Sequence, residues 1–169
     1  MWSARLRSVK ALAIGCVCGV AAIAGACSDG SPTVPSSSQP LPFQGSLQAT
    51  DTDTLAFPIL TVHLEGGGTA TQIGAYTAVF DFTANLATPD VPAAGTFTLR
   101  AANGDTITGS LSGRAQIADG IATVVETMTI TGGTGRFASS TGSFTVRRTV
   151  VQATGVTSGS LDGTITLRN

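Results

Sequence analysis

The chain has 169 residues, of which 42% are hydrophobic and only 11% are charged, and its formal net charge is −1. Its only Lys and two of its Arg lie within the first ten residues, whereas all ten acidic residues follow Cys27. From Cys27 onward, six Arg against ten acidic residues leave a net charge of −4. A mildly acidic domain cannot hold a phosphate backbone by charge, so these totals exclude nucleic acid as a partner.

The N-terminus has the pattern of a secretory leader. Three positive charges precede an unbroken run of 16 small and apolar residues, Ala11 to Ala26. This run is short for a transmembrane helix, which needs about 20 apolar residues. The pattern predicts a signal peptide over residues 1–26, with a retained N-terminal anchor helix as the alternative.

The leader ends in Ile23-Ala24-Gly25-Ala26-Cys27. This segment resembles the lipobox of bacterial lipoproteins, in which the Cys becomes the lipidated first residue after cleavage. The motif usually has Leu where this chain has Ala24, and an ordinary signal peptidase could also cut at the same bond. The two other cysteines lie in the leader, so the mature chain keeps Cys27 alone and can form no intramolecular disulfide.

The lipoprotein resemblance implies that Cys27 is acylated and holds the protein on a membrane that the chain does not cross. Ser28 follows the Cys in place of Asp, which implies sorting to the outer membrane or cell surface. With ordinary cleavage, the protein would instead be periplasmic or secreted. Residues 27–42 are rich in Pro and Ser and are predicted to form a disordered, partly extended linker to a domain over residues 43–169.

From Phe43 onward, short runs of strand-forming residues are separated by turn residues. The predicted strands cover residues 43–49, 56–65, 74–85, 95–102, 105–116, 121–131, 142–152 and 158–168. Asn103-Gly104 and Asp119-Gly120 are hairpin signals, so consecutive strands are expected to pair antiparallel. No helical period is present to cover an apolar sheet face. The sequence therefore predicts an all-β fold, an antiparallel up-and-down β-barrel of about eight strands.

Alternation with period two separates the apolar face of each strand from its polar face. The expected interior residues are Tyr76, Ala78, Phe80, Phe82, Phe97, Leu99, Ile107, Gly109, Leu111, Leu161, Gly163, Ile165 and Leu167.

Three segments carry a family resemblance: AANGDTITGSLSG (101–113), GGTGRFASSTGSFTV (132–146) and SGSLDGTITL (158–167). Together they resemble the bacterial allene oxide cyclase barrel-like proteins, which are calycin-like relatives in fold of the plant cyclases and dirigent proteins. The resemblance implies that the Gly-rich turn caps the barrel. Its Phe is expected to plug the barrel mouth, and its Arg guanidinium to bond loop carbonyls. The turn signature consists of Gly132, Gly133, Gly135, Arg136 and Phe137.

Glu126 and Arg148 are the only charged residues on two otherwise apolar strand faces. If the hairpin pairs Ile130 with Phe144, Glu126 lies opposite Arg148. Each charge would be costly inside a barrel without the other, so an ion pair in the interior or at the rim of the barrel is predicted. Two sharper roles stay open: the pair orients a polar group of a ligand, with Tyr76 as a neighbour, or Glu126 is an acid or base.

The remaining chemistry is sparse. His63 is the only histidine and alternates onto a polar face beside Glu65. With no second His and no free Cys in the mature domain, neither a metal nor a cofactor is predicted. The sequence favours a non-enzymatic barrel that binds a small apolar or amphipathic molecule or serves as a cell-surface structural module. The alternative is an isomerase or cyclase that acts on a hydrophobic substrate inside the barrel.

Overall fold

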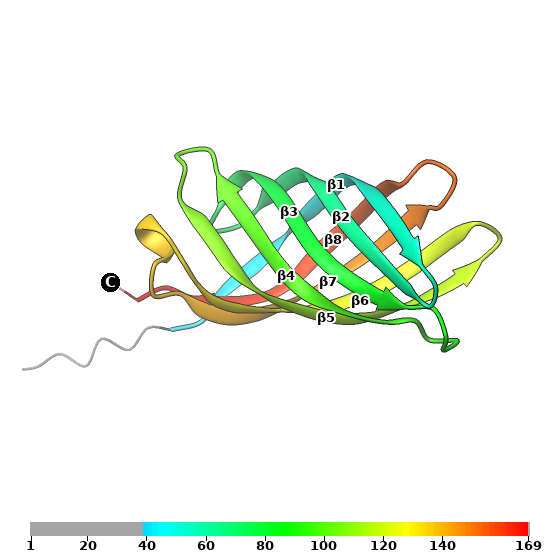
Figure 1. The fold of residues 1–169 in the computed structure, drawn as a ribbon. Coiled ribbons are helices and arrows are strands. Elements are labelled where there is room, and N and C mark those ends of the chain that lie inside the picture. The colour runs from blue at the N-terminus through cyan, green and yellow to red at the C-terminus, as the bar shows by residue number, and fades with distance from the viewer. Residues whose placement is uncertain (1–38, 169) are drawn as a thin grey trace, which may run out of the picture. The chain divides into compact units, whose positions relative to one another are not determined.

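The computed structural model describes residues 39–168, which form a closed barrel of eight antiparallel strands arranged in chain order (Figure 1). Each strand pairs with its sequence neighbours, and β1 pairs with β8 to close the sheet without a free edge. The predicted up-and-down barrel is confirmed. The strands are β1 (Leu41–Ala56), β2 (Ile59–Ala70), β3 (Gly74–Asn85), β4 (Pro92–Ala101), β5 (Thr106–Ala118), β6 (Ile121–Gly133), β7 (Thr141–Val151) and β8 (Val156–Thr166).

The N-terminal predictions fall largely outside this part of the chain. The signal peptide over residues 1–26, the lipidated Cys27 and most of the 27–42 linker lie outside the described residues. β1 begins at Leu41, slightly before the domain start predicted at Phe43. Between residues 39 and 168, no helix is long and apolar enough to cross a membrane.

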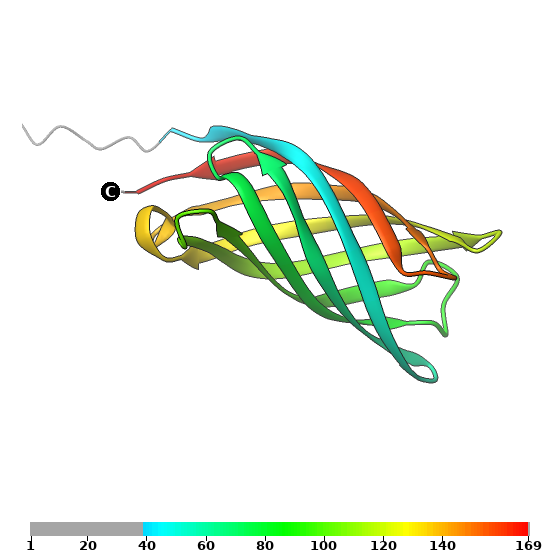
Figure 2. The ribbon, with the colours of Figure 1, turned by 90° about the horizontal axis from the view of Figure 1, so that it is seen from above.

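The two ends of the barrel differ (Figures 1 and 2). One end, called here the capped end, holds the start of β1, the end of β8 and the β2–β3, β4–β5 and β6–β7 connections. The other, called the open end, holds the β1–β2, β3–β4, β5–β6 and β7–β8 connections. The described chain therefore enters and leaves the barrel at the same end.

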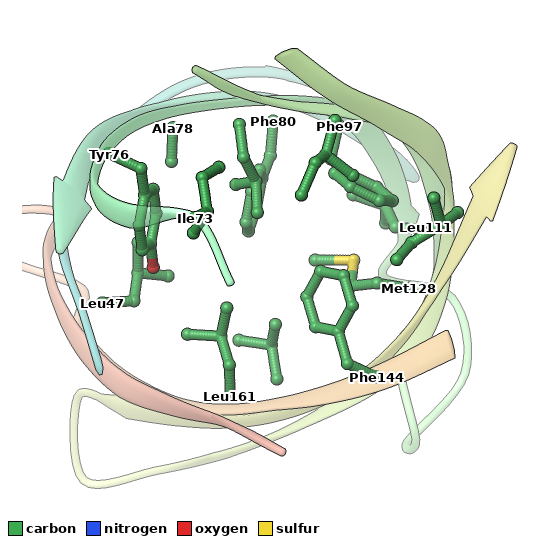
Figure 3. Close-up of a cluster of buried hydrophobic side chains, with 14 of the residues drawn as sticks. Leu47, Ile73, Tyr76, Ala78, Phe80, Phe97, Leu111, Met128, Phe144 and Leu161 are labelled. Carbon is green, nitrogen blue, oxygen red and sulfur yellow. The ribbon is translucent and has the colours of Figure 1, made fainter. Parts of the chain in front are cut away.

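Aromatic rings fill the middle of the barrel, where Phe80, Phe97 and Phe144 point inward from three strands (Figure 3). The ring centroids lie 5.5 Å apart for Phe97 and Phe144, and 4.9 Å apart for Phe43 and Phe144. Phe80 lies edge-on to Phe97 at 6.3 Å. Tilted and edge-on contacts of this kind suit the charge distribution of aromatic rings. All four rings are at most 2% exposed, so this level of the interior is occupied by buried side chains.

Glycines make room for these rings on the neighbouring strands. Gly163 is the cross-strand partner of Phe144, and Gly109 is the partner of Phe97. A Cβ atom on Gly163 would lie 2.7 Å from the Cβ of Phe144, which is too close for any residue with a side chain. Pairing small with large residues is how a narrow barrel fits bulky side chains inside.

The Gly-rich turn forms η1 (Gly135–Phe137), a single 3₁₀ turn that closes the capped end. Phe137 is fully buried in the main core cluster, as expected for a plug. Gly135 has φ of +56°, and a Cβ there would collide with the Asp105 carboxylate, so the position requires glycine. The Arg136 guanidinium lies 4.7 Å from the centre of the Phe137 ring. It stacks on the plug, and no bond from it to a loop carbonyl occurs among residues 39–168.

Candidate functional site

A pocket opens at the open end of the barrel, above the packed aromatic rings. Most of its lining is apolar and comes from strands all around the barrel. It encloses about 70 Å³ of space, several times the roughly 10–15 Å³ that one water needs by the same kind of measure. A small molecule, or one end of a longer one, therefore fits. The apolar lining residues are Leu60, Val62, Phe82, Ala84, Leu86, Val91, Ala93, Ala115, Ile117, Ala122, Val124 and Val150.

The floor of the pocket is a buried ion network centred on Arg148. Both Arg148 and Glu126 are buried, with exposed fractions of 4% and 0%. Arg148 Nε donates to Glu126 Oε2 at 3.0 Å, and Nη2 donates to Glu126 Oε1 at 2.9 Å. This forked arrangement is the strongest geometry available to a guanidinium and a carboxylate. It satisfies both oxygens of Glu126 from one side chain.

A second carboxylate completes the network. Arg148 Nη1 donates to Asp51 Oδ2 at 2.9 Å, and the Thr157 hydroxyl donates to Asp51 Oδ1 at 2.9 Å. The Phe82 ring centre lies 5.5 Å from the Arg148 guanidinium. Every buried side-chain nitrogen and oxygen among residues 39–168 has a hydrogen-bond partner. The network thus joins β1, β6, β7 and β8 without leaving an unsatisfied group.

Two glycines on the neighbouring strands make room for the charged side chains inside the barrel. Gly113 is the cross-strand partner of Glu126, and a Cβ there would lie 2.6 Å from the Glu126 Cγ. Gly159 is the partner of Arg148, and a Cβ there would lie 2.7 Å from the Arg148 Cβ. The neighbouring strands therefore have glycine opposite both charged residues of this ion pair, as they have opposite Phe97 and Phe144.

The network shifts the ionisation of two side chains. Burial lowers the pKa of Arg148, but its hydrogen bonds and attraction to Glu126 and Asp51 outweigh burial and raise that pKa above the usual value. Burial, together with the nearby charge of Asp51, raises the pKa of Asp53 at the pocket wall. Arg148 therefore holds its proton more firmly than an ordinary Arg, and Asp53 takes up a proton more readily than an ordinary Asp.

The Glu126–Arg148 ion pair was expected from the sequence, but the expected register was wrong. The hairpin pairs Met128 with Phe144, so Glu126 lies opposite Val146 and Arg148 lies opposite Val124. The two charged residues are diagonal neighbours, a separation that a long Arg side chain can span. The shift of two residues keeps every side chain on its predicted face, so period-two alternation could not detect it.

Asp51 and Asp53 were missed as site residues because Asp51-Thr52-Asp53-Thr54 reads as a turn. β1 instead continues to Ala56, well beyond the predicted end at residue 49. Ionic contacts inside the barrel hold this segment extended, because Asp51 bonds both Arg148 and Thr157. The sequence did contain a signal for Asp51. Phe43, Leu47 and Ala49 occupy inward positions with period two, and Asp51 is the next position in that alternation.

Tyr76 does not join the site. It lies near the start of β3, on the capped side of the barrel, and does not line the pocket. Its hydroxyl donates to the carbonyl oxygen of Ser46 at 2.8 Å, and burial raises its pKa to about 12. The structure therefore brings Glu126 and Arg148 together. Tyr76 lies elsewhere, among the buried apolar side chains shown in Figure 3.

His63 lies on the outer wall of the barrel. Its Nδ1 lies 2.6 Å from Asp81 Oδ1, and its Nε2 lies 3.2 Å from Glu65 Oε1. These hydrogen bonds, to Asp81 first and then to Glu65, raise its pKa above 6.5. Within residues 39–168, no three or more His, Cys, Asp and Glu side chains are grouped so that they could hold a metal ion.

This geometry gives a direct pH prediction. In an NMR titration of this only histidine, we expect His63 to titrate above 6.5 and Asp81→Asn to lower its pKa. Because the folded pKa is raised, the contribution to stability is complete below the unfolded value of about 6.5 and is lost as the pH rises through the folded pKa. Asp90→Asn, in a distant loop, is the control. An unchanged pKa in Asp81→Asn would show that the contact does not exist in solution.

Comparison with known proteins adds no further assignment. A scan against protein-family models, a search of the curated proteins and a search of the solved structures each find no significant match to this chain. The structure itself shows a closed antiparallel barrel of eight strands, with buried aromatic rings at one level and a pocket above a buried ion network at another.

Proposed function

We propose that this chain is an exported, lipid-anchored barrel that binds a small apolar or amphipathic molecule in the pocket at its open end. The observation that carries the proposal is the pocket, whose apolar walls end on a charged floor. Small-molecule sites typically combine apolar walls with a few fixed polar groups. A purely structural module would need no such hollow, and nearer its capped end the same barrel is occupied by a cluster of buried apolar side chains.

Binding without catalysis is favoured by the state of Glu126. Both of its oxygens accept hydrogen bonds from Arg148, and its side chain has no exposed surface. To act as an acid or base it would first have to break a buried ion pair, which is costly. The allene oxide cyclase-like family remains our proposed relationship, supported by the segments over residues 101–113, 132–146 and 158–167 and by the capping turn. The cyclase or isomerase activity that this family implies has no comparable support.

A fluorescent apolar probe tests the pocket. We expect N-phenyl-1-naphthylamine to bind the full chain and Ala122→Phe to weaken its binding by about tenfold or more, because the added ring would occupy the pocket. Ala75→Phe, on the exposed outer wall, is the matched control and should bind the probe normally. Circular dichroism would confirm that both variants are folded. Equal probe binding by both variants would mean that the probe does not use this pocket.

Lipidation at Cys27 has its own test. In cells fed an alkyne-labelled fatty acid, we expect the wild-type protein to carry the label and Cys27→Ser to lose it. A double Cys16→Ser/Cys18→Ser variant is the control and should keep the label, because those cysteines lie in the predicted leader. An unlabelled mature protein beginning at Cys27 would instead indicate ordinary cleavage and a periplasmic or secreted protein.

A further inference from the structure

The exposed large apolar side chains of residues 39–168 are confined to the open end of the barrel. They occupy three separate hairpins around the mouth of the pocket. Phe57, at the tip of the β1–β2 hairpin, is 76% exposed, and Leu55 beside it is 58% exposed. We call this set the apolar rim; it consists of Leu55, Phe57, Ile59, Ile117, Ile121, Val151 and Val156.

We propose that the apolar rim inserts into the surface of a lipid bilayer, so that the mouth of the pocket opens onto the lipid that supplies its ligand. This inference rests on the proposed function, because it names the source of the bound molecule. Exposed apolar clusters of this kind are uncommon on free protein surfaces and mark sites of contact.

The position of the rim favours a bilayer over a protein partner. Ile117 belongs to the rim and also lines the pocket, so the two apolar surfaces are continuous. A rigid partner seated on all three hairpins would cover the mouth between them. A fluid apolar phase can surround the tips and still let a molecule pass into the pocket. An apolar ligand also partitions from water into lipid, so a bilayer is a concentrated source of it.

The charges near the rim indicate which lipids it contacts. The four connections at the open end contain two acidic residues, Asp90 and Asp119, and no Lys or Arg. Two exposed charged residues also line the pocket at this end, the acidic Asp53 and the basic Arg114, so the exposed charge here is acidic on balance. Anionic lipids attract basic segments and repel acidic ones. We therefore expect the rim to enter neutral, zwitterionic phosphatidylcholine surfaces, and anionic lipid to weaken the contact.

Tryptophan reporters in the full chain test the insertion directly. Trp2, the only tryptophan, is replaced by Phe, and single reporters are introduced as Phe57→Trp or Val156→Trp on two different hairpins. With phosphatidylcholine vesicles brominated in their acyl chains, we expect both reporters to shift to shorter wavelength and lose most of their emission. The matched control, Ser110→Trp on the exposed outer wall of β5, should be unaffected even if a lipid anchor holds the protein on the vesicle.

The outcomes separate this inference from the proposed function. If neither rim reporter is quenched while N-phenyl-1-naphthylamine still binds, the membrane contact is wrong and the ligand site stands. If both reporters are quenched but the probe does not bind, the membrane contact is supported and the ligand site is rejected. A blue shift that needs no vesicles and grows with protein concentration, without quenching by brominated lipid, would place the rim against a second copy and overturn the inference.

Discussion

Replacing Arg148 with Met is expected to lower the free energy of unfolding by about 3–5 kcal/mol, as is typical when one member of a buried ion pair is removed. Met has a similar length, so little packing is lost, but Glu126 and Asp51 then lose the cation that offsets their burial. Chemical denaturation measures the loss. Arg147→Met is the matched control: Arg147 is the next residue on β7 and is exposed, so we expect a change within about 0.5 kcal/mol.

A double variant tests whether the loss comes from the unpaired charge. Arg148→Met/Glu126→Leu removes both members of the bidentate pair, and we expect it to be more stable than Arg148→Met alone, because well-packed apolar residues can replace a buried pair. A double variant no more stable than the single variant would show that the unpaired charge is not the cause of the lost stability.

The variant Glu126→Gln tests whether the ion pair takes part in ligand binding. Unchanged affinity for the fluorescent probe would show that the pair contributes to stability alone.

The architecture could be predicted because period-two alternation fixes which side chains face inward. Phe80, Phe97 and Leu161 are buried as expected. The turn pairs were also reliable: Gly104 and Gly120 have φ of +92° and +76°, the conformation in which Gly is favoured at tight hairpins. These signals are local, since each depends only on residues adjacent in sequence.

The site could be predicted only in part because its geometry depends on how strands meet around the barrel. Asp51 bonds Arg148 across 97 positions of sequence, through closure of the sheet rather than through a hairpin. Alternation assigns Asp51 no partner, and the composition of its segment is typical of a turn. The same limit explains the hairpin register, since a shift by two residues preserves the pattern of faces.

The pocket could not be predicted for a related reason. Phe82 and Phe80 share an inward face on β3 and belong to one core cluster, yet Phe80 packs edge-on against Phe97 and Phe82 lines the pocket. What separates them is their level along the barrel axis, which is set by the stagger of all eight strands. Sequence patterns indicate that a side chain faces inward, but not whether other side chains fill the barrel interior at the same height along the axis.

The packed level is tested by removing its central ring. Phe144→Ala is expected to lower the free energy of unfolding by about 3–5 kcal/mol, because the ring is buried and contacts both Phe43 and Phe97. Phe57→Ala deletes the same atoms from an exposed hairpin tip, and we expect chemical denaturation to show a change within about 0.5 kcal/mol. Similar losses in both variants would mean that the interior is not packed around Phe144. If the two levels are independent, folded Phe144→Ala should also bind N-phenyl-1-naphthylamine as the wild type does, since Phe144 does not line the pocket.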